Sequence, residues 1–240
     1  MKKKSVQTSL IILTRNEIEG VRAVLSKVPK RSVDEIFAVD YQSKDGTVEY
    51  FTSHGIPVIS QKKPGRSEAF RIGVNHSHGR YLVFFLLVGN EDPADIPKLI
   101  ALLKKGNDVA IASRFMRGSR NEEDDQVFKF RAWANQGFTA LANLLFNGHV
   151  TDSINGYRAI TRTAFDRLHL DAEGFAIEYQ MSMRAMKLGM SIRELSTREG
   201  NRIGGQSTSY AISTGLKFVG YLIREIVIGR SFDPATSHTK

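Results

Sequence analysis

The chain has 240 residues, of which 41% are hydrophobic and 25% are charged, as is usual for a folded globular protein rather than a disordered one. It contains no cysteine, which excludes disulfide bonds and thiolate metal sites and favours a reducing, cytoplasmic compartment. The formal net charge of +9 indicates either an ordinary solubilising surface or anionic partners, namely phosphorylated ligands or an anionic membrane face. Zinc-finger spacing and RNA-binding aromatic signatures are absent, so nucleic acid is not an expected partner.

Short apolar strands alternate with helices along most of the chain. The pattern predicts strands at residues 9–14, 35–39, 56–59, 81–88, 108–113 and 191–195. It predicts helices at residues 17–28, 66–78, 93–104, 132–146 and 175–188, and one more after the polar turn 40–47. Residues 119–126 form a charged break that we expect to be a mobile loop. This alternation implies right-handed crossovers and a mainly parallel sheet, so the expected class is α/β, with ligands beyond the carboxyl ends of the strands.

The segment 210–229 has the pattern of an amphipathic helix. Its apolar positions are Ile212, Leu216, Val219, Ile223 and Ile226. Two interpretations stay open: the helix packs on the protein's own core, or it lies in a membrane interface. No stretch reaches the ~18–20 apolar residues that a bilayer-spanning helix needs. We therefore expect a main domain at residues 1–209 and an amphipathic helix and tail at residues 210–240.

Six short motifs occur in order over most of the chain, and each is weak by itself. They are Thr14-Arg-Asn16-Glu17, Val39-Asp-Tyr-Gln-Ser-Lys-Asp-Gly-Thr47, Lys63-Pro-Gly-Arg-Ser-Glu-Ala69, Ser113-Arg114, Asp152-Ser-Ile-Asn-Gly-Tyr-Arg158 and Arg202-Ile-Gly-Gly-Gln-Ser207. Together they resemble the motifs of family 2 glycosyltransferases, in particular the dolichol-phosphate and polyprenol-phosphate sugar synthases. The resemblance implies a GT-A-type fold for nucleotide-diphospho-sugar transfer, with a mainly parallel central sheet flanked by helices.

The resemblance also implies an activity. The expected enzyme is a hexosyltransferase that moves a hexose from a UDP- or GDP-sugar to a polyprenyl phosphate by inverting displacement, peripherally at the cytoplasmic membrane face. Two alternatives remain open. One is a non-catalytic paralogue that binds nucleotide-sugars and has lost metal-assisted transfer, and the other is a soluble transferase that acts on a hydroxyl acceptor.

Polar residues at strand ends are the candidates for nucleotide binding. Asp40 can accept hydrogen bonds from ribose hydroxyls or a base N–H; its alternative role is a helix N-cap, for which Asp45 is the better candidate. Glu17 is a candidate for ligand contact; its alternative role is to stabilise a helix N-terminus through the helix dipole. Arg66 can form bidentate bonds to a diphosphate. The full set of expected donor-binding residues is Thr14, Asn16, Glu17, Asp40, Arg66 and Asn90.

The metal site departs from the family pattern, which has Asp-x-Asp after the fourth strand for Mg²⁺ or Mn²⁺. Here Val88-Gly89-Asn90 occupies that place, and a register two residues earlier would put Leu86 and Val88 there. Hard divalent cations require several oxygen ligands, and valine supplies none. Asn90 and Asp92 are the remaining metal ligands, so a weak or lost site is expected.

Arginines are the candidates on the acceptor side, because the resemblance places Arg114, Arg131 and Arg202 there. A lipid phosphate is already ionised near pH 7, so positioning and charge neutralisation can supply most of the catalysis. A hydroxyl acceptor would instead need a carboxylate base, for which Asp92 is the candidate. Each arginine taken alone could also be a solvated surface residue.

Overall fold

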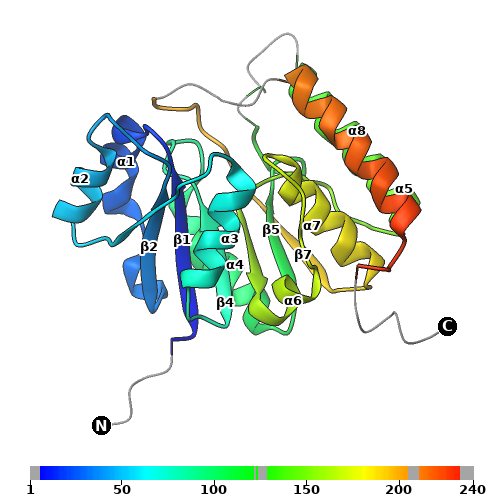
Figure 1. Ribbon diagram of the computed structural model, residues 1–240, viewed down its shortest axis with the longest axis horizontal. Coiled ribbons are helices and arrows are strands. Elements are labelled where there is room, and N and C mark those ends of the chain that lie inside the picture. The colour runs from blue at the N-terminus through cyan, green and yellow to red at the C-terminus, as the bar shows by residue number, and fades with distance from the viewer. Residues whose placement is uncertain (1–5, 122, 124–128, 205–210, 233–240) are drawn as a thin grey trace.

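The computed structural model describes residues 6–121, 123, 129–204 and 211–232, within which a seven-stranded sheet is flanked by helices (Figure 1). The strands are β1 (Thr8–Thr14), β2 (Glu35–Asp40), β3 (Val58–Ser60), β4 (Tyr81–Phe85), β5 (Val109–Ser113), β6 (Arg158–Thr161) and β7 (Ile192–Ser196). The α-helices are α1 (Ile18–Val24), α2 (Thr47–Ser53), α3 (Arg66–His76), α4 (Ile96–Lys104), α5 (Phe130–Phe146), α6 (Arg162–Arg167), α7 (Ala176–Lys187) and α8 (Ala211–Ile228). Short 3₁₀ turns are η1 (Leu25–Lys27), η2 (Lys30–Ser32) and η3 (Pro93–Asp95).

The sheet has the strand order β3-β2-β1-β4-β6-β5-β7. β6 runs antiparallel to both of its neighbours, and the other pairings are parallel. The carboxyl ends of the parallel strands therefore meet at one edge, and β6 begins at that same edge. The prediction of an α/β fold with a mainly parallel sheet is confirmed.

The central strand β1 is buried on both faces, because helices cover the sheet on each side. Leu10 and Ile12 point into one core, together with residues of α1, α2 and α4. Ile11 and Leu13 point into the other core, together with residues of α3, α6 and α7. This alternation is the period-2 geometry of a strand between two helical layers.

A third cluster joins α5, α7 and α8 at the end of the molecule furthest from β2, where Figure 1 shows α8 in front of α5. Phe218 and Leu222 of α8 are buried in it, so the helix does pack on the protein's own core. Its other face, which includes Leu216 and Ile223, is exposed. Within the described residues, no helix is both long and apolar enough to cross a membrane. The division at residue 209 stays a prediction.

The predicted strand 81–88 is shorter in the structure, because β4 ends at Phe85. The next backbone N–H, that of Leu86, donates to Glu91 Oε2 at 2.7 Å, and Gly89 has a φ of 93°, so the chain turns away from the sheet. Both β6 and α6 were not predicted, since charged Arg158 and Arg162 interrupt the apolar pattern.

The charged break at residues 119–126 is only partly described. Arg120 is not loose: its N–H donates to Thr197 O at 3.0 Å, and its carbonyl accepts from Glu199 N at 2.9 Å. Residues 122 and 124–126 lie outside the described residues.

Candidate functional site

Two cavities lie side by side beyond the carboxyl ends of the strands. The strand cavity, of about 330 Å³, is lined by residues that follow β1, β2 and β4. The helix cavity, of about 230 Å³, lies between the ends of β4 and β5 and helices α5, α7 and α8. Arg66, Leu86, Phe175 and Arg202 line both, so the two cavities share a wall. This position agrees with the rule that ligands of parallel α/β sheets bind beyond the carboxyl ends of the strands.

The strand cavity holds a buried carboxyl paired with an arginine. Glu17 stands at the N-cap of α1 without capping it; its Oε1 accepts from Arg202 Nη2 instead. Burial raises the pKa of Glu17 to about 7, although Arg202 opposes the shift. Tyr41 lines the same cavity, with the Arg15 guanidinium 4.9 Å from its ring centroid. The cavity therefore offers an aromatic face, a cation and a carboxyl group.

Arg66 is one of the two arginines on the shared wall. Its Nε donates to Oε1 of Glu178, a residue of α7 that is 2% exposed. The guanidinium carbon lies 5.5 Å from the ring centroid of Phe175. A Cβ added to Gly156 would lie 1.8 Å from Arg66 Nη2, so the absence of a side chain at Gly156 makes room for this guanidinium. Charge, stacking and a glycine therefore fix the place of Arg66.

The turn 152–158 connects the acceptor-side arginines to the sheet edge. Arg114 and Asp152 form a bidentate pair: Arg114 Nε donates to Asp152 Oδ2 at 2.7 Å, and Arg114 Nη2 donates to Asp152 Oδ1 at 3.0 Å. Burial alone would raise the pKa of Asp152, but Arg114 and backbone hydrogen bonds outweigh it and hold that pKa below its usual value. Arg158 is fully buried and donates to carbonyls of Ser153 and Glu178. Burial lowers the pKa of Arg158 to about 10. These contacts make the turn a rigid support.

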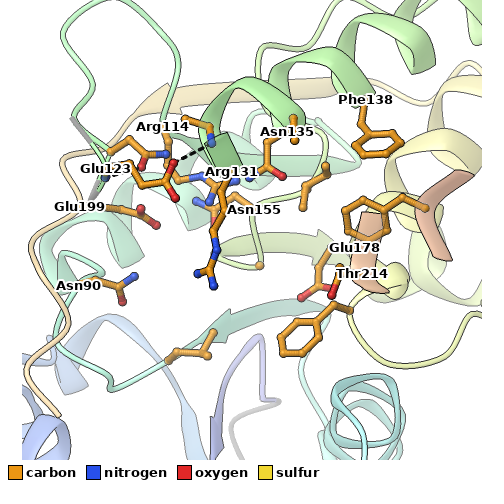
Figure 2. A pocket seen from close by; sticks show the side chains of 18 of the residues that line it. Asn90, Arg114, Glu123, Arg131, Asn135, Phe138, Asn155, Glu178, Glu199 and Thr214 are labelled. Carbon is orange, nitrogen blue, oxygen red and sulfur yellow. Dashed lines mark hydrogen bonds between the residues drawn. The ribbon is translucent and has the colours of Figure 1, made fainter. Parts of the chain in front are cut away.

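Figure 2 looks into the helix cavity, with Asn90 and Glu199 on one side, Glu178 on the other and Arg131 between them. Arg131 is the second residue of α5. The start of that helix is held by Glu123, whose Oε2 accepts from Ala132 N at 2.9 Å, the dashed line in Figure 2. Arg131 is thus presented to the cavity by a fixed helix end.

Four buried side-chain oxygens have no hydrogen-bond partner among the described residues, and all four belong to residues that line these cavities. They are Thr14 Oγ1, Glu17 Oε2, Asn90 Oδ1 and Glu178 Oε2. Buried polar atoms are almost always paired in folded proteins, so an unpaired group needs an explanation. The four atoms can all accept hydrogen bonds, which suits a ligand rich in hydroxyl groups.

The residues after β4 do not fit a tight divalent metal site. Leu86 and Val88 carry no oxygen in their side chains, and Asn90 offers one amide oxygen. The Asp92 carboxylate accepts from Ala94 N at 2.9 Å at the start of η3, outside both cavities. Glu91 Oε2 accepts from Leu86 N. In the described part of the chain, no three His, Cys, Asp or Glu residues gather where they could hold a metal, and hard cations need several oxygens.

The structure brings most of the expected site residues together. Thr14, Glu17, Arg66 and Arg202 line the strand cavity, and a further group lines the helix cavity: Arg66, Asn90, Arg114, Arg131 and Arg202. Asn16 lies apart, because its Oδ1 accepts from Lys44 N at 2.8 Å and its N–H donates to Ser43.

Asp40 also lies outside both cavities and lines a separate hollow beside α2 and β3. Its two carboxylate oxygens accept from the backbone N–H and the hydroxyl of Ser43. The N-cap of α2 is Gly46, and Asp45 accepts from Thr47 N at 3.1 Å in that first turn. The neighbour of Asp40, Tyr41, is the β2-end residue that reaches the strand cavity. Nucleoside contact by Asp40 stays a prediction.

Several lining residues were not expected from the sequence. Glu91 is buried, and this burial raises its pKa to about 8. Glu178 and Phe175 stand at the start of α7, and Glu199 lies in the segment after β7. One signal was available: Glu178 is an acid inside a largely apolar helical stretch, which indicates a buried carboxylate. Glu199 had no such signal.

Comparison with known proteins gives the following matches. Residues 9–168 match the family model described as glycosyl transferase family 2. The chain is 26% identical over 197 residues to the glycosyltransferase AglJ of Haloferax volcanii, covering 82% of this chain and 64% of that protein. It is 28% identical over 182 residues to the dolichol-phosphate mannosyltransferase of Pyrococcus furiosus, covering 72% and 51%. The chain thus spans about half to two thirds of the length of these relatives.

A third relative is the undecaprenyl-phosphate mannosyltransferase of Micrococcus luteus, 26% identical over 197 residues and covering 77% of this chain and 80% of that protein. Among solved structures, glucosyl-3-phosphoglycerate synthase from Mycobacterium tuberculosis, in complex with Mn²⁺ and UDP-glucose, superposes with a TM-score of 0.69. The superposition covers 95% of this chain and 80% of that one at 20% identity. The prediction of a GT-A fold is confirmed.

Proposed function

The chain belongs to glycosyl transferase family 2, as its motifs indicated, and from this membership we propose that it transfers a hexose from a UDP- or GDP-sugar to a polyprenyl phosphate. The four unpartnered oxygens around the two cavities support the proposal most strongly. A nucleotide-sugar carries ribose and hexose hydroxyls that donate to such oxygens, and a diphosphate that pairs with the arginines between them.

The donor fits across the shared wall. The strand cavity takes the nucleoside, for which Tyr41 offers a ring and Thr14 and Glu17 offer acceptors. The diphosphate then lies beside Arg66 and Arg202, and the hexose enters the helix cavity, where Asn90 and Glu178 accept from its hydroxyls. This placement assigns a partner to each of the four unpaired oxygens.

The reaction is a single displacement at the anomeric carbon. An oxygen of the lipid phosphate forms the new bond to that carbon, the bond to the diphosphate oxygen breaks, and the nucleoside diphosphate leaves with the electron pair. The configuration inverts, and no base is needed because the attacking phosphate is ionised near neutral pH. Arg114, Arg131 and Arg202 hold the attacking phosphate by charge.

A phosphate acceptor suits the site better than a hydroxyl acceptor. Asp92, the base expected for a hydroxyl acceptor, is engaged with Ala94 N outside both cavities. The helix cavity is instead lined by four arginines, which suit a phosphate: Arg66, Arg114, Arg131 and Arg202. Relatives named as dolichol-phosphate and undecaprenyl-phosphate mannosyltransferases also act on lipid phosphates. The proposed acceptor is therefore the phosphate head of a polyprenyl lipid.

An apolar surface next to the helix cavity suits a lipid carrier. This apolar ridge consists of Trp133, Leu141, Leu144 and Leu145 of α5 and Leu216, Val219, Ile223, Ile226 and Val227 of α8. Leu144 is 82% exposed and Val227 79%. Exposed apolar side chains gathered on two neighbouring helices are typical of membrane or protein contact sites. We propose that the ridge rests on the cytoplasmic membrane face, assisted by the chain's net charge of +9.

The activity is tested by incubating the full chain with polyprenyl phosphate and labelled UDP- or GDP-hexoses. Label in the lipid fraction, with release of the nucleoside diphosphate, is expected. The Arg131→Gln variant should lose at least about tenfold in turnover, because a charge-assisted contact to the acceptor is removed. Arg31→Gln, an exposed arginine of η2, is the matched control. Nucleotide binding without transfer to any lipid phosphate would favour the non-catalytic paralogue.

Membrane docking is tested by co-sedimentation with anionic liposomes. The double variant Leu144→Asp/Ile223→Asp should lower binding by about tenfold or more, since charge is placed on the apolar ridge. Ala101→Asp, an exposed position on α4, adds a similar charge elsewhere as a control. Equal binding by both variants and the wild-type chain would contradict the docking proposal.

A further inference from the structure

The loop after β4 presents aliphatic side chains to the place where the diphosphate is proposed to lie. Leu86 lines both cavities and Val88 lines the helix cavity, whereas Leu87 between them is buried in the core. Whether the family's Asp-x-Asp aligns with Val88 and Asn90 or with Leu86 and Val88, Val88 occupies the place of one metal-binding aspartate. The two acids that follow in the sequence are engaged with backbone N–H groups: Glu91 with Leu86 and Asp92 with Ala94. These acids are therefore not available to hold a cation, and the negative charge of a diphosphate must be neutralised by other groups.

Arg66 is placed to meet part of that charge. Its side chain is 17% exposed, and it lines both cavities from the start of α3, beside Leu86. The Phe175 ring and the space at Gly156 hold the guanidinium in position, so little side-chain freedom remains to be lost on binding. Its partner Glu178 uses one oxygen for this pair and leaves the other unpaired.

Arg202 is carried by a segment that runs along the same loop. The N–H of Ile203 donates to Val88 O at 3.0 Å, and the N–H of Gly200 donates to Asn90 O at 2.8 Å. Arg202 Nε donates to Gly204 O at 2.8 Å, which orients the guanidinium toward Glu17. Because burial raises the pKa of Glu17 to about 7, this carboxyl can be protonated near neutral pH and release Arg202 to a phosphate. The loop in which Leu86 and Val88 carry no carboxylate is thus paired with a segment that supplies a cation.

We infer that a nucleoside diphosphate binds on the shared wall without a divalent cation, its charge neutralised by the guanidinium groups of Arg66 and Arg202. The inference rests on the proposed donor site and specifies how that site recognises the diphosphate. Two bidentate guanidinium groups can match a diphosphate in charge and in hydrogen-bond geometry. Since Arg202 lies on the wall common to both cavities, it can contact the leaving diphosphate and the incoming lipid phosphate.

Titration calorimetry of the full chain with UDP and GDP tests the inference, in buffer with EDTA and in buffer with Mn²⁺ or Mg²⁺. The dissociation constant of the preferred nucleotide is expected to agree within about twofold between the two buffers. Binding that requires the metal would overturn the inference and leave the transferase proposal standing. Failure of both nucleotides to bind in either buffer would instead overturn the proposed function.

Variants of the loop make the test sharper. Leu86→Asp/Val88→Asp introduces two carboxylates, so binding in EDTA should weaken and Mn²⁺ should restore it by about tenfold or more. Leu86→Asn/Val88→Asn has a similar shape without the charge, and its nucleotide affinity should not respond to Mn²⁺. A metal response equal to that of the wild-type chain in both variants would contradict the placement of the diphosphate at this loop.

Substitutions of Arg66 and Arg202 complete the binding test. Arg202→Gln should weaken binding in EDTA by about tenfold to a hundredfold, the expected loss of a charged hydrogen-bond pair, and Arg66→Gln should do the same. Arg202 is the safer position for folding, because Glu17 can become protonated when its partner is removed. The control is Arg31→Gln, with unchanged affinity expected. Unchanged affinity of a folded Arg202→Gln variant would overturn the inference.

Discussion

Two sets of buried ion pairs join distant parts of this chain, and they differ in how completely their polar atoms are paired. Between α7 and α8, the fully buried Glu225 accepts from Arg184 Nε at 2.9 Å, from Lys187 Nζ at 2.6 Å and from Gln180 Nε2 at 2.9 Å. Around the strand and helix cavities, Glu17 and Glu178 each hold one arginine with one oxygen and leave the other oxygen unpaired.

The difference separates a structural use of buried charge from a ligand-binding use. The α7–α8 network satisfies both oxygens of its carboxylate, so it holds α8 in one register on α7 and leaves nothing for a ligand. The Glu17 and Glu178 pairs line the cavities, and each leaves one carboxyl oxygen without a hydrogen-bond donor, which folding alone does not explain. Arginine–glutamate pairs look alike in a sequence, and only the count of unpaired atoms distinguishes them.

The largest expected effect comes from breaking the satisfied network. Glu225→Ala leaves Arg184 and Lys187 buried without their shared carboxylate, which should lower the free energy of unfolding by about 3–5 kcal/mol. Urea denaturation measures this, with the exposed Glu173→Ala as the control. A loss below about 1 kcal/mol, the value typical of surface pairs, would contradict the structural assignment.

A pH dependence of the free energy of unfolding, of similar size, is expected from Glu91, the buried acid of the helix cavity. Burial raises the pKa of Glu91 to about 8 from 4.5, so between these values the folded chain keeps a proton that the unfolded chain has lost. Stability should therefore fall as pH rises from 5 to 8, by about 3 kcal/mol from this group. Glu91→Gln keeps an acceptor for Leu86 N and should remove most of that fall in urea titrations. An identical pH slope in both proteins would count against the shifted pKa.

A smaller effect is expected from displacing Arg66 while keeping its charge. A Cβ at residue 156 would overlap Arg66 Nη2, so Gly156→Ala should push the guanidinium aside and weaken UDP or GDP binding by about tenfold. Gly137→Ala on α5, where a Cβ meets open space, is the matched control and should bind normally. Normal binding by both variants would mean that the position of Arg66 is unimportant for the nucleotide.

Much of the fold could be predicted from the sequence, because alternating apolar strands and helices leave few topologies open. The confirmed family membership follows from six ordered motifs rather than from any one of them. β6 was missed because a buried arginine opens it: Arg158 is held by carbonyls that the local sequence does not reveal. The end of β4 was misplaced because Glu91 captures the N–H of Leu86 from five residues away.

The candidate site was predictable in part. Arg66, Arg114 and Arg202 were found from motif positions and Arg131 from the family resemblance, and the structure gathers them around two cavities. Asp92 was expected in the site as a metal ligand or as a base for a hydroxyl acceptor, and the structure places it at the start of η3, outside both cavities. Glu178 and Glu199 reach the site through tertiary packing, from helix and loop segments more than eighty residues beyond β4. Sequence patterns with local periods do not report such pairings.

The most direct measurement of the central claim is a crystal structure of the full chain with UDP or GDP bound. The diphosphate is expected on the shared wall beside Leu86, contacted by Arg66 and Arg202, with the nucleoside in the strand cavity. A nucleotide bound elsewhere, with Arg202 still paired to Glu17 and no contact between Arg66 and the diphosphate, would contradict the claim that these two cavities form the donor site.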